Sequence, residues 1–382
     1  MAAYYKDVEV VAHNGSVIYT NTLTTQEVYE EFGIASNSHA FCLDGAKRDR
    51  IVWIGDFVHT ARMLAASTGR FDSIQTFMGQ GKQYREAYYP SEYSETDYQF
   101  FFLVTLGDYY VLTSDTALLG KYWNGTKFLV ETMVDRYLDP VSGLFAGSDA
   151  FWFTAQGTQN PTAPTALFAI ALLWSDALGA YRVSLTQSQA NGLLATTYTI
   201  RAGIANTTQA TKGLEKLSDL FYQIGYKDSS TIGNGRNTQL SPNVQGFLLE
   251  SLFLAHTQLN VSATTVVPVI KNLLDVFWPT MLHQNQYHMG APWEYLFPDG
   301  SPGIGIFTSL SHPWGGAPTY VLSDYVLGVR REMNATTETY GWVFDPVWEI
   351  VEGLRLQWAK GRVPLMGGGL IEAKWSLRNG MG

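Results

Sequence analysis

The chain has 382 residues, of which 46% are hydrophobic, 14% aromatic and 15% charged, and its formal net charge is −9. This length allows two or three domains, although large single-domain barrels also reach it. The acidic balance and the lack of a basic run argue against nucleic acid and an anionic membrane surface as partners. The single cysteine, Cys42, excludes an intrachain disulfide and a cysteine-based metal site.

Residues 1–40 differ in character from the rest of the chain. The run VEVVAHNGSVIYTNTLTT surrounds an Asn-Gly turn signal with β-branched residues, which predicts a hairpin or an irregular extended segment. The sequence shows neither a signal-peptide core nor an apolar run long enough for a transmembrane helix. Five Asn-x-Ser/Thr sequons nevertheless hint at a secretory ancestry, so the compartment stays open. They begin at Asn14, Asn124, Asn206, Asn260 and Asn334.

From about Asp49 onward the chain is a succession of helix-like blocks. The first block carries an apolar stripe at helical spacing, made of Ile54, Phe57, Val58, Ala61, Leu64 and Ala65. Further blocks cover 96–115, 117–138, 162–184, 185–204, 241–259, 266–282 and 317–331. Because strands do not alternate with these helices, the pattern predicts an α/α toroid or a helical bundle, and not a nucleotide-binding α/β fold.

The C-terminal tail changes character again. In RVPLMGGGLIEAKWSLRNGMG a glycine-rich run precedes alternating apolar residues, which is typical of the beginning of a β-domain. The seven histidines are scattered and no calcium-loop pattern occurs, so we expect no metal site and no organic cofactor.

The stretch DGAKRDRIVWIGD, residues 44–56, concentrates charge in a chain that has little of it. If a helix begins near Asp49, its periodicity places Asp49, Trp53 and Asp56 on one face. Positive potential at a helix N-terminus would stabilise acids there. The alternative is a capped helix start with a surface ion-pair cluster, which is the more common cause of such a stretch taken alone.

A second cluster of polar and aromatic residues occupies a Gly/Pro-rich region, HMGAPWEYLFPDGSPGIGIFTSLSHPWGG. Glu294 follows Trp293 in a loop, and His312 stands beside Trp314 just before a predicted helix. Burial beside aromatic rings would raise the pKa of a carboxyl group and suit it to acid–base chemistry. A solvent-facing glutamate and a core or capping histidine remain the alternatives.

Together these two stretches resemble the α-L-rhamnosidases of bacteria and fungi, a six-hairpin α/α toroid family. The first is similar to the family pattern D-C-P-Q-R-D-E-R-L-G-W-T-G-D, and the second to G-x-T-x-W-E-x-W…S-x-N-H-x-x-x-G. GSDAFW at 147–152 resembles the family's G-D-W loop, and RVPLMGGGLIEAKW resembles the start of its C-terminal β-sandwich. The resemblance covers about residues 35–375.

The resemblance implies an all-α chain with an (α/α)6 toroid, possibly incomplete, and short β segments at both ends. It divides the chain into an extended or β segment at 1–40, the toroid at 41–362, and the beginning of a truncated β-sandwich at 363–382. On this resemblance we expect the chain to lack the N-terminal β-domains usual in the family. In the family they would pack against the toroid.

The resemblance also implies inverting hydrolysis of terminal α-L-rhamnosides, with Glu294 as general base. The family's general acid is a glutamate that this shorter stretch lacks. Asp49 takes its place when the motifs are aligned on Trp53, but matches the preceding aspartate when they are aligned on Asp44. A rhamnosylated glycan or glycoside is the implied partner. The residues implied to contact the sugar are Asp44, Arg48, Trp53, Asp56, Asp149, Trp152, Trp293 and His312.

Two other classes of function remain open. The missing glutamate and the truncation allow a non-catalytic relative that binds carbohydrate. Another six-hairpin glycosidase is possible too, as is a polysaccharide lyase that neutralises a uronate carboxylate with Lys47, Arg48 and Arg50.

Overall fold

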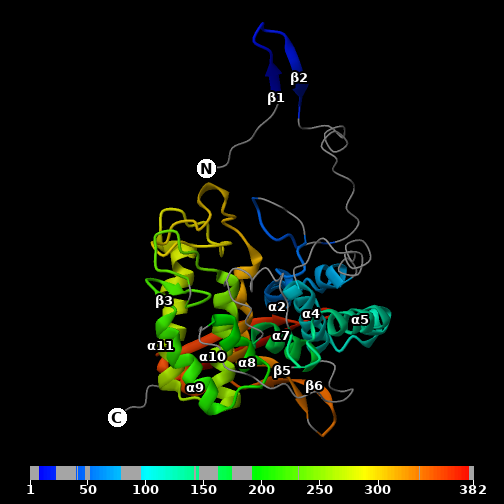
Figure 1. The fold of residues 1–382 in the computed structure, drawn as a ribbon, viewed down its shortest axis with the longest axis vertical. Coiled ribbons are helices and arrows are strands. Elements are labelled where there is room, and N and C mark those ends of the chain that lie inside the picture. Colours follow the sequence, from blue (N-terminus) through cyan, green and yellow to red (C-terminus); the bar gives the residue numbers. More distant parts are fainter. Residues whose placement is uncertain are drawn as a thin grey trace. The chain divides into compact units, whose positions relative to one another are not determined.

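The structure is a computed structural model that describes residues 8–22, 40, 42–47, 52–78, 96–141, 143–145, 162–173, 192–230, 232–334 and 336–377. These residues fall into two units, 1–40 and 41–382. In the first unit, β1 (Val8–Val11) pairs antiparallel with β2 (Val17–Asn21), and Gly15 in the turn has a φ of +83° (Figure 1). The hairpin predicted from the Asn-Gly signal is therefore confirmed.

Among the described residues of the second unit, six helices pack in a closed ring. Each helix contacts the next, and the last contacts the first. The ring consists of α2 (Phe57–Ser67), α4 (Thr96–Thr113), α7 (Thr162–Leu173), α8 (Leu193–Arg201), α10 (Pro242–Leu259) and α12 (Ala317–Val321). Three more helices pack outside it: α5 (Thr116–Tyr137) on α4, α9 (Thr207–Glu215) on α8 and α10, and α11 (Ala263–Asn272) on α9 and α10 (Figure 1).

Aromatic side chains fill much of the space between the ring helices. Phe100, Phe101 and Phe102 are all buried, because α4 has neighbours on several sides and not only on one face. The ring of Phe101 stacks on that of Phe247 with centroids 5.5 Å apart, which joins α4 to α10. Packing of this kind accounts for much of the high aromatic content.

Several helix starts follow their sequence signals. The Asp115 carboxylate accepts a hydrogen bond from the Leu118 amide at 3.0 Å and caps α5. Ser241 caps α10 ahead of Pro242, whose missing N–H costs nothing in the first turn. A capping box at Asn206 begins α9, a separate helix that the sequence patterns did not predict.

The predicted helix at 317–331 ends earlier than expected. After α12 the chain makes a π-helical turn at Leu322–Leu327, and Gly328 then adopts a left-handed φ of +85°. A Cβ at Gly328 would lie 2.3 Å from the Pro346 backbone nitrogen, so only glycine fits this bend. The residues that follow form strand β5, because the close approach to Pro346 turns the chain out of the helix.

Strands lie between helices as well as in the short β segments that the sequence predicted at the two ends. β3 (Phe221–Tyr222) pairs with β4 (Gly225–Tyr226), and β5 (Val329–Asn334) with β6 (Thr339–Phe344). A short helix, α13 (Trp348–Gly353), precedes the hairpin of β7 (Trp358–Pro364) and β8 (Leu370–Ser376). None of the described helices has the length and apolar character needed to cross a membrane.

Candidate active site

Four ring helices begin at the same end of the ring. The Tyr98 hydroxyl in the first turn of α4 donates to the Asp56 carboxylate at the start of α2, at 3.1 Å. A Cβ on Gly315, just before α12, would lie 3.1 Å from the Cβ of Pro242 at the start of α10. Helix N-termini leave free N–H groups and positive potential, so this end of the ring favours acids and hydrogen-bond acceptors.

Asp56 stands at the N-cap of α2 but makes no side-chain cap hydrogen bond. Its Oδ2 instead lies 3.1 Å from Nε2 of His312, and the aspartate is 5% and the histidine 4% exposed. A carboxylate partner favours the tautomer in which Nε2 carries the proton. The helix begins at Phe57 and not near Asp49, so the predicted helical face shared by Asp49, Trp53 and Asp56 was wrong.

Gly55 gives a physical reason for the late helix start. A Cβ at this position would lie 2.1 Å from the ring of Tyr98, so the backbone before α2 is pressed against that ring. Trp53 keeps a partly exposed ring there, with its centroid 6.2 Å from that of Tyr98 in an edge-on arrangement.

Residues 44–47 lie alongside the segment that leads to His312. The Ala46 amide donates to the Ser309 hydroxyl and to the Ser311 carbonyl, both at 3.1 Å. Asp44 is 6% exposed, and its ligand atom lies within 4.8 Å of those of Asp56 and His312. A Cβ on the adjacent Gly45 would lie 2.8 Å from Nδ1 of His312, so a glycine is required for this close approach.

Glu294 is held in the same region by Ser309. The Ser309 amide donates to Oε2 of Glu294 at 3.1 Å, and the Glu294 amide donates to the Ser309 carbonyl at 3.0 Å. The indole Nε1 of Trp314 donates to the Glu294 carbonyl at 3.2 Å. Glu294 is 4% exposed, so the alternative of a solvent-facing loop carboxylate was wrong.

The structure thus brings together Asp44, Asp56, Glu294 and His312, with Trp53 beside them. Trp293 is fully buried, so its ring offers no face to a sugar and we leave it out of the proposed contacts. Arg48, Asp49, Asp149 and Trp152 lie outside the described residues. The sequence analysis missed Tyr98 and Ser309, because neither residue belongs to a charged motif.

Asp44, Asp56 and His312 are also the one group of described residues whose carboxylate and imidazole atoms could hold a metal ion. Two carboxylates and an imidazole suit several divalent metals. The same groups suit sugar hydroxyls equally well, and His312 and Asp56 already pair with each other. The donor set alone therefore does not require a metal.

A network of buried charges fills the ring below this cluster, and the sequence analysis did not predict it. Arg62 of α2 pairs with Glu250 and with Asp324, the latter at 3.0 Å. Arg201 pairs with Glu250 and with Asp108, both at 3.2 Å. Burial alone would raise the pKa of Glu250, but the two arginines outweigh it and hold that pKa at about 2.

His59 joins the charge network to the helix that carries Asp56. Its Nδ1 lies 3.0 Å from the Tyr320 hydroxyl, and its Nε2 lies 3.0 Å from the Asn243 carbonyl. Burial lowers the pKa of His59 to about 3, so the imidazole is neutral at physiological pH. These contacts fix α2 against α10 and α12, the helices whose first turns border the cluster.

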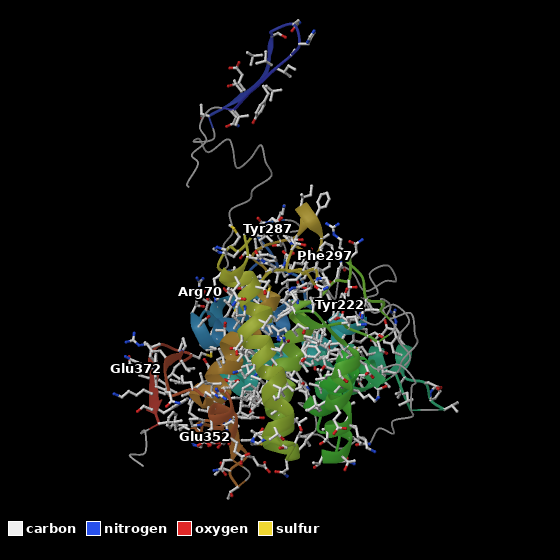
Figure 2. The ribbon with its side chains drawn as sticks, turned by 90° about the vertical axis from the view of Figure 1, so that its left-hand side faces the viewer. Arg70, Tyr222, Tyr287, Phe297, Glu352 and Glu372 are labelled. Atoms are coloured by element: carbon white, nitrogen blue, oxygen red, sulfur yellow. The ribbon has the colours of Figure 1, made fainter. Side chains whose placement is uncertain are left out.

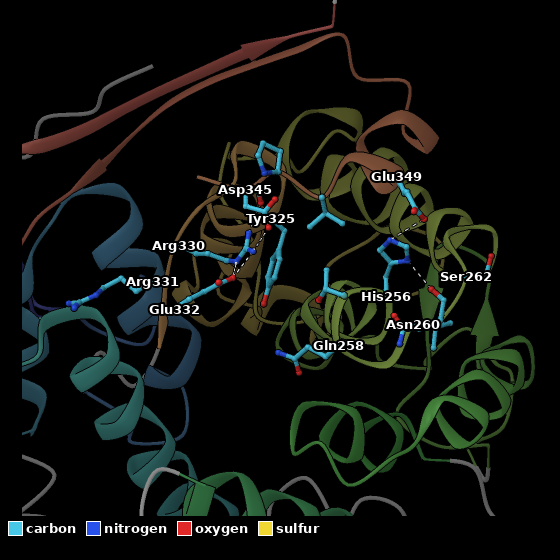
Figure 3. Close-up of a pocket in the computed structure, with 14 residues that line it drawn as sticks. His256, Gln258, Asn260, Ser262, Tyr325, Arg330, Arg331, Glu332, Asp345 and Glu349 are labelled. Carbon is cyan, nitrogen blue, oxygen red and sulfur yellow. Dashed lines mark hydrogen bonds and ion pairs between the residues drawn. The ribbon is translucent and has the colours of Figure 1, made fainter. Parts of the chain in front are cut away.

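A cleft of about 670 Å³ lies at the other end of α10 (Figure 3). An 18-residue helix is about 27 Å long, so the cleft is far from Ser241 and the cluster. Its acids are already paired: Glu332 and Asp345 with Arg330, and Glu349 with His256 (Figure 3). None of the residues of the two motifs lines this cleft, which favours the cluster at the helix starts as the candidate site.

The chain is similar in structure to a GH78 family rhamnosidase of Bacillus sp. GL1, with a TM-score of 0.54 and 19% identity over 86% of this chain and 36% of that one. A rhamnosidase from Klebsiella oxytoca with rhamnose bound gives a TM-score of 0.49 and 17% identity over 74% of this chain and 60% of that one. A sugar epimerase from a ruminal bacterium gives a TM-score of 0.46 and 10% identity over 78% of this chain and 95% of that one.

No protein-family model matches the chain, and no curated protein does either. The chain spans 36% and 60% of the length of the two rhamnosidases. The first similarity shows a shared fold, and it confirms the likeness to α-L-rhamnosidases that the two motifs predicted, at the level of the structure.

Proposed function

We propose that the chain is an α-L-rhamnosidase-like glycoside hydrolase that releases a terminal rhamnose with inversion at the anomeric carbon. The observation that carries the proposal is the hydrogen-bonded arrangement of Glu294, Ser309 and Ala46. It places a buried carboxylate next to the segment that carries Asp44, although the two motifs are far apart in sequence. Such a convergence is what a sugar-cleaving site needs.

Glu294 acts as the general base in this proposal. It takes a proton from a water molecule while the water oxygen forms a bond to the anomeric carbon. The bond between that carbon and the glycosidic oxygen breaks, and Asp49 gives the leaving oxygen a proton. An inverting enzyme holds its two carboxyl groups roughly 6.5–9.5 Å apart, which leaves room for the water.

Asp44, Asp56 and His312 hold the sugar hydroxyls in this proposal. Carboxylates accept hydrogen bonds from hydroxyl groups, and such charged hydrogen bonds are stronger than neutral ones. Nδ1 of His312 is buried and has no hydrogen-bond partner among the described residues, so it is left to accept one from a ligand. Trp53 supplies a partly exposed ring for the apolar face of the sugar. Arg48, Asp149 and Trp152 stay in the proposal as further contacts.

We further infer that the six-helix ring is the inner layer of an (α/α)6 toroid, with α5, α9 and α11 in the outer layer. The lyase alternative is less well supported. Lys47, one of the three cations it needs, donates to the Ile306 carbonyl.

The stereochemistry of the product tests the reaction class. Proton NMR during hydrolysis of an aryl α-L-rhamnoside should show β-rhamnose first, before mutarotation. A panel of other aryl glycosides should give little or no turnover. First formation of the α anomer would contradict an inverting mechanism, and binding of rhamnosides without turnover would favour the non-catalytic alternative.

A further inference from the structure

We infer that the side-chain amide of Asn243, in the first turn of α10, binds the sugar hydroxyls that lie deepest in the site, those on C3 and C4 of the rhamnose ring. The inference rests on the proposed function, which places rhamnose at the cluster. Asn243 is 1% exposed, and neither its Oδ1 nor its Nδ2 has a hydrogen-bond partner among the described residues. A buried amide without a partner costs free energy, so its presence in a folded protein calls for a use.

Other unpartnered polar atoms belong to residues around the candidate site. The indole Nε1 of Trp293 and Nδ1 of His312 are also buried without a partner among the described residues. Trp293 precedes the proposed base Glu294, and the turn that follows His312, η6 (Pro313–Gly315), packs against α2 and α10. Polar groups that are left unpaired in the free protein and gathered in one region are available to a ligand.

Asn243 belongs to the face of α10 that is turned to the inside of the ring. Phe247 follows it by four residues, so the two side chains lie on the same face. The Phe247 ring contacts rings of three other ring helices. Its centroid lies 4.2 Å from that of His59 in α2, 5.5 Å from that of Phe101 in α4 and 5.1 Å from that of Tyr198 in α8. These contacts show that this face of α10 points inwards.

Asn243 lies on the site side of this aromatic layer. Helical side chains lean towards the N-terminus of their helix, so the Asn243 amide leans towards the helix starts. Nε2 of His59 lies 3.0 Å from the Asn243 carbonyl and would lie 2.9 Å from a Cβ on Gly246, which sets the first turns of α2 and α10 at the same height. Asp56 precedes His59 by three residues, or about 4.5 Å along a helix. The Asn243 amide is therefore at the floor of the site, below Asp56.

The proposed base, Glu294, lies on the outer side of Asn243. Leu240, three residues before Asn243, exchanges backbone hydrogen bonds of 2.8 and 3.0 Å with Leu296, so the segment of the base lies beside the chain that enters α10. This segment is at the end of the unit where Phe297 is labelled (Figure 2). The base activates a water that attacks the anomeric carbon, C1, so C1 faces outwards. C4 is opposite C1 in the sugar ring and points to the floor.

The amide of Asn243 matches a pair of neighbouring hydroxyl groups. Its Oδ1 accepts a hydrogen bond from the hydroxyl on C4, and its Nδ2 donates one to the hydroxyl on C3. A site that is built to hydrogen-bond a hydroxyl rejects an analogue without that hydroxyl, because the buried groups of the protein are then left unpaired. Asn243 therefore selects sugars that carry both hydroxyls.

Binding of L-rhamnose and of its 4-deoxy and 2-deoxy forms, measured by calorimetry, tests the inference. In the wild type, loss of the C4 hydroxyl should weaken binding about tenfold. Asn243→Leu, similar in size but without polar side-chain atoms, should bind L-rhamnose about tenfold more weakly and the 4-deoxy sugar equally well. Loss of the C2 hydroxyl, beside the anomeric carbon, should weaken binding by the same factor in both proteins. Asn243→Ala is a second variant that avoids any clash of the leucine.

The melting temperature distinguishes a ligand contact from a role in the fold. Asn243→Leu removes a buried polar group that has no partner among the described residues, so the melting temperature should stay the same or rise. Asn260→Ala is the matched control, at the other end of α10, where Asn260 has a left-handed φ of +53°. Alanine is strained in that conformation, so this variant should melt at a lower temperature but bind L-rhamnose as the wild type does.

The outcomes separate the two proposals. Lower melting temperatures with unchanged affinity in both Asn243 variants would mean that the amide serves the fold, and would overturn the inference. A variant that still distinguishes L-rhamnose from the 4-deoxy sugar would also overturn it, while turnover of an aryl α-L-rhamnoside would leave the proposed function standing. If the predicted binding is found without turnover, the proposed hydrolysis fails and the inference stands. If the folded wild type neither binds rhamnose nor hydrolyses the rhamnoside, both fail.

Discussion

The Asp56 carboxylate stands at the N-cap of a helix, yet its partner is the imidazole of His312, 256 residues further along the chain and 3.1 Å away. The pair shows that Asp56 itself does not act as a helix cap, which was one interpretation of the charged stretch at 44–56. A capped helix start would turn Asp56 towards its own helix, whereas the structure turns it towards Tyr98 and His312.

Substitutions of Asp56 should distinguish its hydrogen bonding to His312 and Tyr98 from a helix-capping role. Asp56→Ala removes an acceptor from the buried His312 and the partly buried Tyr98, and should lower the free energy of unfolding by about 2 kcal/mol or more. Asp56→Ser should not restore the loss, although serine is a good cap. Asn206, whose side chain caps α9 by accepting from the Gln209 amide, is the control: Asn206→Ala should cost about 1 kcal/mol and Asn206→Ser much less. Chemical denaturation measures all four, and rescue by serine at Asp56 would contradict the account.

The buried charge network should be sensitive to the loss of one partner. Arg62→Met would leave Glu250 and Asp324 without their shared cation inside the ring, and should cost about 3–5 kcal/mol. Arg70→Met removes the same side chain from an exposed pair with Asp72, where solvent weakens the interaction, and should have far less effect. Similar losses of thermal stability in both variants would show that the network is not buried as described.

Asp228 should make stability depend on pH. Burial raises its pKa from 3.8 to about 7 in the folded protein. Between about pH 4 and 7 the folded protein keeps a proton that the unfolded chain has lost, so the free energy of unfolding falls as pH rises through this window, by up to about 4 kcal/mol. Asp228→Asn removes this contribution. The free energy of unfolding of the variant should therefore rise relative to that of the wild type between pH 5 and pH 8. A difference in unfolding free energy that stays constant over this range would rule out the raised pKa.

The role of Asp49 can be tested with a series of aryl rhamnosides that differ in the acidity of the leaving phenol. An acid helps a poor leaving group most, so Asp49→Asn should lose roughly 10²-fold or more on the least acidic phenols and little on dinitrophenol. A uniform loss across the series would mean that Asp49 only positions the substrate. Rescue of the variant on the activated substrate also shows that it is folded.

Much of the fold could be predicted from the sequence, because the helices have strong local signals. Asp115 and Ser241 mark helix starts that the structure confirms. The start of α2 was misplaced because the apolar stripe continues back to Ile54, whereas the actual boundary depends on Gly55 packing against Tyr98. Such a contact, between residues of different helices, has no local pattern.

The site was predictable only in part and for a similar reason. Motif similarity indicated Glu294, His312 and Asp56, but the bridging role of Ser309 depends on backbone geometry in two loops. Arg62 and Glu250 resemble ordinary surface residues in the sequence, since only the closing of the ring buries them together. The motifs therefore indicated residues of the candidate site but not the charge network beneath it.

The most direct test of the account is the turnover of an aryl α-L-rhamnoside by Glu294→Gln. The substitution keeps the size of the side chain and its acceptor for the Ser309 amide, but removes the base. Asp299→Asn is the matched control, because this acid lies in the same loop and its carboxylate accepts only from Ser301 among the described hydrogen bonds. The account predicts a loss of about 10²–10⁴-fold in kcat for Glu294→Gln, with an unchanged melting temperature and a fully active control. Retained turnover in folded Glu294→Gln would contradict the assignment of the base, and with it the proposed mechanism.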